Sequence, residues 1–482
     1  MITITRRLAQ QFRAMLRRAF GQVRTGPAIG FIAGAEGLTV KCMYADAAIE
    51  LRVPGARAAE ALWLPFQALD DFEAKKDDPV ELTAADNNRV SVGWRDGTVP
   101  QIAEYDSPPP HDIDKFPVSP SDLATNPPGL LQALHEASEV ANTGNPRYAV
   151  DCLQLCPDGT INATDGHQAL TQSGFAFPWS APLLVPRNKV FHSPELSQDK
   201  PVDVAQSGDW LVVGVEPWTI YQRINKDGRF PSMERIMPDP AGATARCQLS
   251  QDDARFLVDT LPRLPCQDEE NSPVTLDVNG HIAIRAKSAD QAKPTEVVLT
   301  NSHCSGEPTR ININRMYLKR AMRLGLRELC LYGAEAALLG HADNRKLVWM
   351  PLEPGAAIQP TEGSLCIESP KAEASASISP PLKPKTERKV QPVSEPIANT
   401  NGNGHAQANG HATKTNGQVR KPKTSQHDIG ALIEQAIKLR TALHDRMQEA
   451  GELVRALKQH RRQSRAVQQT LDQIRTLKTL GV

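Results

Sequence analysis

The segment LLVPRNKVFHSPELSQDKPVDVAQSGDWLVVGV, residues 183–215, contains the pattern on which the fold prediction depends. A helix-sized stretch leads into VDVAQS and WLVVGV, in which apolar and polar residues alternate on either side of a Gly-Asp turn. Alternation with a period of two around such a turn is typical of a β-hairpin. The segment therefore predicts a helix followed by an antiparallel hairpin.

The same pattern occurs twice more in the chain. Residues 62–94 read LWLPFQALDDFEAKKDDP and then VELTAADNNRVSVGW, and residues 310–342 read RININRMYLKRAMRLGLR and then ELCLYGAEAALLGHA. The first two copies leave through proline-marked segments, KFPVSP at 115–120 and GRFPSMERIMP at 228–238. An internal repeat of about 120 residues indicates that one structural unit is used three times.

A further helix is predicted near the start of each copy, at Leu8–Phe20, Leu130–Val140 and Ser250–Leu261. In the first of these, helical spacing predicts an apolar face opposite an arginine face. The apolar face consists of Leu8, Phe12, Met15 and Ala19, and the opposite face of Arg6, Arg13 and Arg17. Two helices packed on antiparallel sheet, three times over, predict an α+β fold.

Composition and pattern together predict five segments. The repeated domains are placed at 1–118, 119–243 and 244–358, a disordered linker at 366–425, and a helical coiled-coil tail at 427–479. The linker is rich in Pro, Ser, Asn and Gly and has almost no large apolar residues, so it cannot bury a core.

Apolar residues in the tail recur in steps of four and three, which is typical of a short coiled coil or a helical hairpin. A single amphipathic helix packed on the rest of the chain explains the same spacing, and the basic charge of the tail leaves a contact with DNA or a membrane surface open. These apolar residues are Leu432, Ala436, Leu439, Leu443, Ala450, Leu453, Leu457, Val467, Leu471 and Ile474.

Charge and cysteine content exclude several classes of protein. Lys plus Arg and Asp plus Glu both total 55, so the chain is not a uniformly basic nucleic-acid binder, although local basic surfaces remain compatible with this balance. The 8 cysteines lack the paired spacing of a zinc site, so we expect free thiols, no metal and no cofactor. The sequence has no membrane-length apolar segment and no secretion signal, which favours a cytoplasmic protein.

Three motifs give the sequence a family resemblance. They are ATDGHQAL at 163–170, GRFPSMERIMP at 228–238 and LVWMPLEP at 347–354. Together they resemble the bacterial DNA polymerase III beta subunit, the beta sliding clamp, which has ATDGHRL, GRFPDYRRVLP and VVMPMRL at the same relative places. The resemblance covers about residues 1–354, and three motifs in the same order are more specific than any one of them.

The resemblance implies a non-catalytic processivity factor. Three clamp domains per chain would form a ring-shaped homodimer that encircles double-stranded DNA without reading its sequence. The ring would tether the DNA polymerase III alpha subunit, the clamp loader and other replication and repair proteins. It implies a cytoplasmic, nucleoid-associated protein that has no membrane partner.

The resemblance also implies a pocket between the second and third domains for a short partner peptide. By motif position its residues are Val150, Thr164, Gly166, His167, Ala169, Leu170, Pro231, Arg235, Ile236, Val348, Met350, Pro351 and Leu352. Met, Leu, Ile and Val suit an adaptable apolar groove. Gln168 and Ala169 stand where the family has Arg and Leu, and the chain continues well past Pro354, where the family ends. We expect this extension either to compete for the pocket or to recruit a further partner.

Basic residues on the helices are the candidates for contact with DNA phosphates, which position a protein without specifying sequence. Arg24, Arg147 and Tyr148 match DNA-facing positions of the family. The full set is Arg6, Arg13, Arg17, Arg24, Arg147, Tyr148, Arg315, Lys319, Arg320, Arg323 and Arg327. The first helix of copy two carries Glu136 and Glu139 and no basic residue, so the predicted lining is unevenly charged.

Two alternatives to a sliding clamp remain. An enzyme would need catalytic groups, and Asp165 with His167 has no nucleophile or third group to complete a site. A clamp-derived scaffold that binds partner peptides without being loaded on DNA is compatible with the weak motif match of copy one and with the long C-terminal extension.

Overall fold

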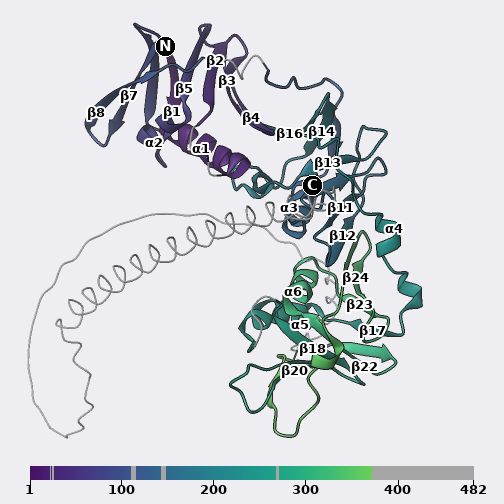
Figure 1. The fold of residues 1–482 in the computed structure, drawn as a ribbon. Coiled ribbons are helices and arrows are strands. Elements are labelled where there is room, and N and C mark those ends of the chain that lie inside the picture. The colour runs from purple at the N-terminus through teal and green to yellow at the C-terminus, as the bar shows by residue number, and fades with distance from the viewer. Residues whose placement is uncertain (22, 24–25, 110–114, 143–147, 267–270, 372–482) are drawn as a thin grey trace, which may run out of the picture. The chain divides into compact units, whose positions relative to one another are not determined.

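The structure is a computed structural model that describes residues 1–371, apart from 22, 24–25, 110–114, 143–147 and 267–270. It is an α+β fold of mainly antiparallel sheets with few helices (Figure 1). The tail predicted at 427–479 and the linker beyond residue 371 lie outside the described residues. None of the described helices has the length and apolar character that crossing a bilayer requires.

The order of elements confirms the threefold repeat. Each copy runs strand, helix, four strands, short helix and three strands, with one additional strand in copy three. Copy one consists of β1 (Ile2–Thr5), α1 (Arg6–Phe20), β2 (Ala28–Gly34), β3 (Gly37–Tyr44), β4 (Ala47–Pro54), β5 (Glu60–Pro65), η1 (Phe66–Ala68), α2 (Leu69–Phe72), β6 (Pro79–Ala85), β7 (Arg89–Asp96) and β8 (Val99–Asp106).

Copy two repeats this order and then continues through a short connection. It consists of β9 (Ala124–Asn126), α3 (Gly129–Val140), β10 (Cys152–Leu155), β11 (Ile161–Thr164), β12 (Gln168–Gln172), β13 (Leu183–Pro186), η2 (Lys189–His192), β14 (Val202–Ser207), β15 (Trp210–Val215) and β16 (Trp218–Arg223). The connection contains α4 (Met233–Ile236) and η3 (Pro240–Gly242).

Copy three has the additional strand β21 and is followed by a strand that has no counterpart in the other copies. It consists of β17 (Ala245–Gln248), α5 (Gln251–Thr260), η4 (Leu261–Arg263), β18 (Pro273–Val278), β19 (Ile282–Ala286), β20 (Thr295–Leu299), β21 (His303–Gly306), β22 (Thr309–Asn314), α6 (Arg315–Arg323), β23 (Glu328–Leu331), β24 (Leu338–Ala342) and β25 (Arg345–Trp349). After it come η5 (Pro354–Ala356) and β26 (Leu365–Glu368).

The strands form four sheets, and two of the sheets join consecutive copies. One sheet has the order β5-β2-β3-β4-β16-β15-β14-β9, so β4 of copy one pairs with β16 of copy two. A second has the order β13-β10-β11-β12-β25-β24-β23-β17-β21, so β12 of copy two pairs with β25 of copy three. Both junctions are antiparallel. The outer sheets are β1-β6-β7-β8 and β22-β18-β19-β20-β26.

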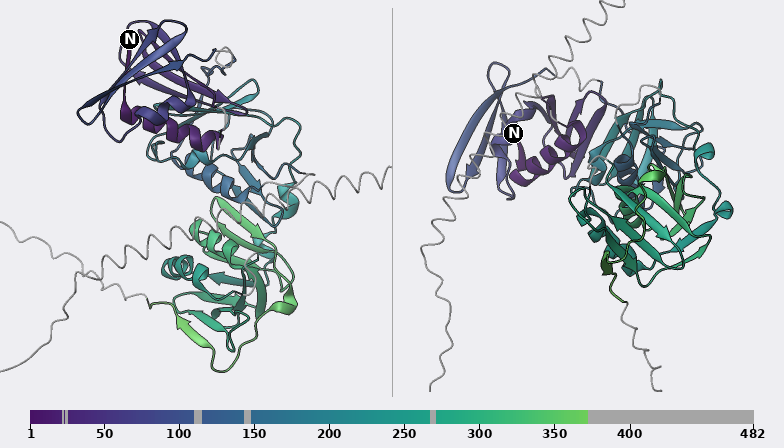
Figure 2. Two further views of the ribbon diagram at one scale, coloured as in Figure 1. Left: turned by 60° about the vertical axis from the view of Figure 1, so that its left-hand side comes forward. Right: turned by 60° about the horizontal axis from the view of Figure 1, so that its bottom comes forward.

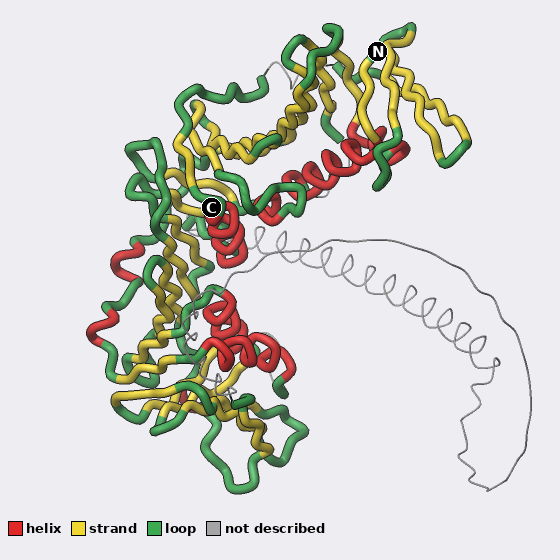
Figure 3. The backbone as a smooth tube through the Cα atoms, turned by 180° about the vertical axis from the view of Figure 1, so that it is seen from behind, coloured by secondary structure: helices red, strands yellow, loops and turns green. Residues whose placement is uncertain are grey.

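The predicted first helices are confirmed within two residues at each end. Helix α1 begins after Thr5, whose hydroxyl accepts a hydrogen bond from the backbone N–H of Leu8 at 3.1 Å, as an N-cap does. Phe12 and Met15 on its apolar face are fully buried. Helix α3 packs on strands β10, β11 and β12, and α5 packs on α6. In the tube view of Figure 3, α3 and α4 lie on opposite sides of these strands.

The prediction of two helices per copy needs correction. The second helix is a full helix only in copy three; in copy one it is η1 followed by the one-turn α2, and in copy two it is the four-residue η2. In copy two, Asn188 caps the turn by accepting from Val190 N, but Ser193 is extended because Pro194 follows it. The helix therefore ends after one turn.

The start of the predicted linker also needs correction. Cys366–Glu368 lie in strand β26, which pairs with β20, so residues 366–368 belong to a sheet. The sequence signal was weak because a four-residue strand is too short for its alternation to stand out beside a Pro- and Ser-rich stretch.

Candidate functional site

The ATDGHQAL motif forms a tight turn between β11 and β12. The Asp165 carboxylate accepts hydrogen bonds from the backbone N–H of His167 at 2.8 Å and of Gln168 at 2.9 Å. Gly166 has φ 93°, a conformation that favours glycine. Since both oxygens of Asp165 are used inside the turn, the second accepting from the Gln168 side chain at 2.8 Å, the residue has a structural role here.

This turn lies against the last motif of copy three. Ala169 of β12 pairs with Val348 of β25, and the backbone N–H of Met350 donates to the carbonyl of His167 at 2.9 Å. Two of the three motifs, separated by about 180 residues of sequence, therefore meet at one strand junction.

Side chains on the α4 side of this junction form a small apolar cluster, which we call the outer cluster. Its buried members are Ala169, Cys330, Leu339 and Val348. Met233 and Met237, at either end of α4, pack against it. The GRFPSMERIMP motif thus contributes its two methionines, which sequence reasoning missed, although their spacing of four residues is that of one helix face.

Beside the outer cluster, two residues of the predicted pocket present apolar surface. Met350 is 51% exposed and Ile236 is 37% exposed. Met350 lies two residues beyond Val348 and therefore on the same side of the chain, because side chains alternate along a strand. Methionines around a partly open apolar surface provide contacts that adapt to different apolar anchors.

The remaining predicted pocket residues differ in position. Leu170 is fully buried in the main core on the α3 side, so its assignment to the pocket is corrected: one step along β12 reverses the direction of the side chain. Val150 is buried and is not part of the outer cluster. Thr164 is buried and donates through its hydroxyl to the carbonyl of Gln168 at 2.7 Å. The half-buried or exposed members of the set are Gly166, His167, Pro231, Arg235, Pro351 and Leu352.

Three of the arginines predicted to face DNA are buried inside the chain. The Arg6 guanidinium donates to the carbonyls of Phe72 at 3.0 Å and Arg95 at 2.7 Å. Arg13 forms ion pairs with Asp70 and Glu73. Arg315 donates to the backbone carbonyl of Pro265 at 3.3 Å and is also buried.

Arg6 and Arg13 are buried for one physical reason. Their part of the arginine face of α1 is covered by the segment around α2, which carries Asp70 and Glu73. Arg315 lies on α6 and is covered instead by the chain at residues 264–265. Arg6, Arg13 and Arg315 are therefore no longer candidates for phosphate contact.

Arg320 is partly engaged at the junction of copies two and three. It donates to the Gln168 side-chain oxygen at 2.6 Å and to the carbonyl of Glu139 at 3.3 Å. Burial lowers the pKa of Arg320, partly offset by the Glu139 carboxylate. Gln168, where the family resemblance expected Arg, is thus the acceptor for a neighbouring arginine.

Two depressions beside the helices are lined by accessible cations. One, of about 650 Å³, lies between α5 and α6 and includes Arg255, Arg323 and Arg327. The other, of about 460 Å³, lies along α1 and includes Arg17, Arg18 and Lys189. Arg18, Lys189 and Arg255 were not predicted.

Some of these cations have acidic neighbours and others have none. Arg323 lies 3.9 Å from Glu139, and Arg17 lies 4.0 Å from Asp70. Within the described part of the chain, Arg327 has no acidic partner, and neither has Lys319 of α6, which lies outside both depressions. Asp259 is the acid that lines the first depression and Glu73 the acid that lines the second, and basic residues outnumber acidic ones in both linings, so both depressions are basic.

The loop residues predicted to touch DNA are only partly described. Arg24 and Arg147 lie outside the described residues. Tyr148 is half-buried, and the guanidinium of Arg229 lies 5.8 Å from its ring centroid, within cation–π range.

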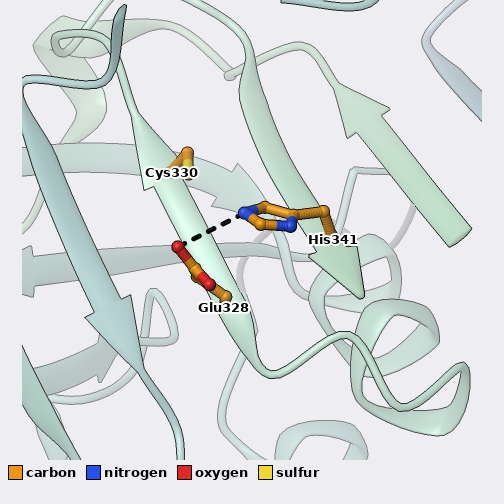
Figure 4. Close-up of side chains that lie close together, drawn as sticks. All are labelled: Glu328, Cys330 and His341. Atoms are coloured by element: carbon orange, nitrogen blue, oxygen red, sulfur yellow. Dashed lines mark ion pairs between the residues drawn. The ribbon is translucent and has the colours of Figure 1, made fainter. Parts of the chain in front are cut away.

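One cluster of metal-ligating residue types lies on the outer face of copy three. Glu328, Cys330 and His341 bring one potential ligand atom each to within 4.8 Å of the others (Figure 4). Arg246 lies among them, with its guanidinium 3.1 Å from Glu328 Oε1 and 3.4 Å from Cys330 Sγ. A bound cation would meet this positive charge, so the cluster is better described as an ion-pair network.

Comparisons with known proteins show the fold. No protein-family model matches the chain, and no curated protein sequence matches it. The chain resembles the solved DNA polymerase III subunit beta of Pseudomonas aeruginosa, with 19% identity and a TM-score of 0.60 over 73% of this chain and 99% of that one.

Clamps from two other bacteria match over the same share of the chain. The DNA polymerase sliding clamp of Bacillus subtilis matches with 15% identity and a TM-score of 0.61 over 73% of this chain and 98% of that one. The beta subunit of Borrelia burgdorferi matches with 13% identity and a TM-score of 0.59 over 73% of this chain and 97% of that one. The resemblance found in the sequence is therefore confirmed at the level of the fold.

Proposed function

We propose, from the fold that this chain shares with the DNA polymerase III beta sliding clamps, that it is a DNA sliding clamp. In this proposal a ring-shaped homodimer encircles duplex DNA and tethers DNA polymerase as a non-catalytic processivity factor. The supporting observation is that copy two continues a sheet of copy one at the β4–β16 junction, and copy three continues a sheet of copy two at the β12–β25 junction.

The repeat predicts how two chains would close the ring. At each junction the last strand of one copy pairs with the strand that ends a sheet of the preceding copy, β16 with β4 and β25 with β12. By the same rule, β8 of one chain would pair with β20 of a second chain, because β8 is the last strand of copy one and β20 is the counterpart of β4 and β12. Two such contacts related by a twofold axis close the assembly.

Strand β8 has the surface expected of such an edge. It ends the sheet β1-β6-β7-β8, and Ile102 in its middle is 76% exposed. A long edge strand with exposed apolar residues readily pairs with another strand. With one domain for each copy of the repeat, we propose domains at 1–118, 119–243 and 244–358. Two chains then give six domains in the ring.

The basic depressions would face the DNA. Phosphate contacts by Arg17, Arg18, Arg255, Arg323 and Arg327 would attract the duplex without reading its bases, as a sliding protein requires. Such contacts weaken with salt, and they leave the protein able to move along the helix.

The outer cluster and Met350 would bind partner peptides. An apolar surface at the junction of two copies suits a short segment with apolar anchors, such as those of the DNA polymerase III alpha subunit and the clamp loader. We propose a cytoplasmic, nucleoid-associated location on the same basis.

The burial of arginines favours one alternative, a clamp-derived scaffold that binds peptides without being loaded on DNA. Arg6, Arg13 and Arg315 are used inside the chain, so the phosphate-facing surface is less basic than the sequence predicted.

Primer extension separates the two functions. With a bacterial DNA polymerase III core and clamp loader, a sliding clamp lengthens the products made in a single binding event. Unchanged product lengths together with intact peptide binding would exclude the clamp and leave the scaffold.

A further inference from the structure

Strand β26 pairs with the outer edge of β20, the edge at which the repeat predicts pairing with β8 of a second chain. It is the last strand of the order β22-β18-β19-β20-β26, and Leu365–Glu368 pair in parallel with β20. Figure 2 shows β26 as the last coloured element of the described chain, at the edge of this sheet.

The counterparts of β20 show what this edge is used for. Strand β4 binds β16 of the next copy, and β12 binds β25 of the next copy, both antiparallel. Strand β20 follows the same three-strand order within its copy, but its outer edge is filled by a segment of its own chain from beyond copy three.

On the basis of the ring proposed above, we propose that β26 is a guard strand: it occupies the ring-closing edge of β20 and must leave before β8 of a second copy of this chain can pair there. The C-terminal segment that carries β26 would thereby control assembly of the ring.

The guard strand is held by backbone bonds and by side-chain hydrogen bonds just beyond it, which include a clasp at Ser369. Leu365 N donates to the carbonyl of Pro294 at 3.0 Å, and Ser369 N donates to that of Val298 at 2.9 Å. The buried Ser369 hydroxyl accepts from Thr300 N at 2.9 Å, and the Thr300 hydroxyl donates to the Ser369 carbonyl at 3.0 Å. The occupied edge is therefore a defined state and not a loose contact.

Two features make the guard strand replaceable by β8. It has 4 residues, all exposed, and Leu365 and Ile367 are 57% and 40% exposed, so it contributes little apolar burial. Strand β8 has 8 residues and would pair antiparallel, as at the other two junctions. A longer antiparallel ladder makes more hydrogen bonds, and each is slightly stronger than in a parallel one.

Alternate backbone N–H groups of β26 point toward β20 and away from it, so two proline substitutions in the full chain form a matched pair. Leu365 and Ser369 donate toward β20, so by alternation Ile367 also does, whereas the N–H of Glu368 points away. Ile367→Pro therefore removes a bond to β20, and Glu368→Pro leaves that ladder intact. Ser369→Ala loosens the clasp without a proline.

The measurement is the dimer dissociation constant by sedimentation velocity. We expect Ile367→Pro to tighten self-association by about tenfold, the effect of losing one or two net hydrogen bonds from the competing strand, and Glu368→Pro to leave it unchanged. Ser369→Ala should act in the same direction as Ile367→Pro.

A variant of β8 identifies the strand that takes the free edge. Counting from the hairpin pair Asp96–Val99, the N–H of Ile102 points away from β7. Ile102→Pro, added to Ile367→Pro, should cancel the gain in self-association.

Three outcomes contradict the guard strand. If the parent chain dimerises and Ile367→Pro associates equally well, the guard is refuted while the ring stands. If Ile367→Pro and Glu368→Pro both weaken association, β26 is itself part of the interface and does not guard it. If no variant self-associates at any concentration reached, the ring proposal fails, and the guard strand fails with it.

Discussion

Truncation of Met350 tests the proposed peptide surface. Complete burial of a methionine side chain contributes about 1.5–3 kcal/mol. Met350 is 51% exposed, so a bound peptide that covers it would add about 0.8–1.5 kcal/mol. Met350→Ala should therefore weaken peptide binding roughly 4- to 12-fold.

The assay is fluorescence anisotropy with a labelled peptide of the clamp-binding segment of a bacterial DNA polymerase III alpha subunit. Met316→Ala is the matched control, because Met316 is 44% exposed on α6 and lies outside the outer cluster. Thermal unfolding of both variants checks that the fold is retained. A loss under twofold for Met350→Ala, or an equal loss for Met316→Ala, would refute the assignment of this surface.

Three further predictions concern charge, pH and thiol reactivity. Arg327→Ala should lower DNA affinity and reduce the slope of log affinity against log salt by about 1. Arg89→Ala on β7 is the control and should leave that slope unchanged. Equal slopes for both variants would show that Arg327 does not contact DNA. Burial, and then the nearby His192, lowers the pKa of His135, so below about pH 6.5 the unfolded chain takes up more protons than the folded chain and the free energy of unfolding should fall. In urea titrations this fall should be smaller in His135→Asn than in the parent chain. An identical pH dependence of the two proteins would contradict this. Maleimide should label the exposed Cys366 long before the buried Cys247, because burial raises the pKa of the Cys247 thiol to about 12. Peptide mass spectrometry measures both rates, and equal rates would contradict the burial of Cys247 in β17.

Local patterns in the sequence predicted the repeated elements well. The hairpin turns lie where Asn and Gly were expected, with positive φ at Asn87 and Asn88 in copy one and at Gly208 in copy two. These positions could be predicted because turn residues and strand alternation act over a few neighbouring residues.

The misses depend on which distant segment covers a surface. Arg13 lies on the polar face of α1 as predicted, but the segment that buries it comes about 60 residues later and carries its acidic partners. Nothing in the helical periodicity of α1 shows that this face will be covered. The predicted pocket contained Leu170 because motif position was used without the direction of each side chain along β12.

The extension past copy three was predicted to differ from the family, and β26 gives this difference a structural basis. Its position became visible only with the strand order, since residues 366–368 read as the start of a linker. Whether the extension competes for the peptide surface or recruits a partner remains a prediction, because residues 372–482 lie outside those described.

Retention on closed circular DNA tests encirclement most directly. The protein is loaded on a nicked circle by a bacterial clamp loader, washed in 1 M salt, and measured before and after the circle is cut once. At 1 M salt the screening length is about 3 Å, so phosphate contacts alone cannot hold the protein on DNA. The account predicts retention on the washed circle and release on linearisation. Loss during the salt wash, or retention on the cut DNA, would contradict it.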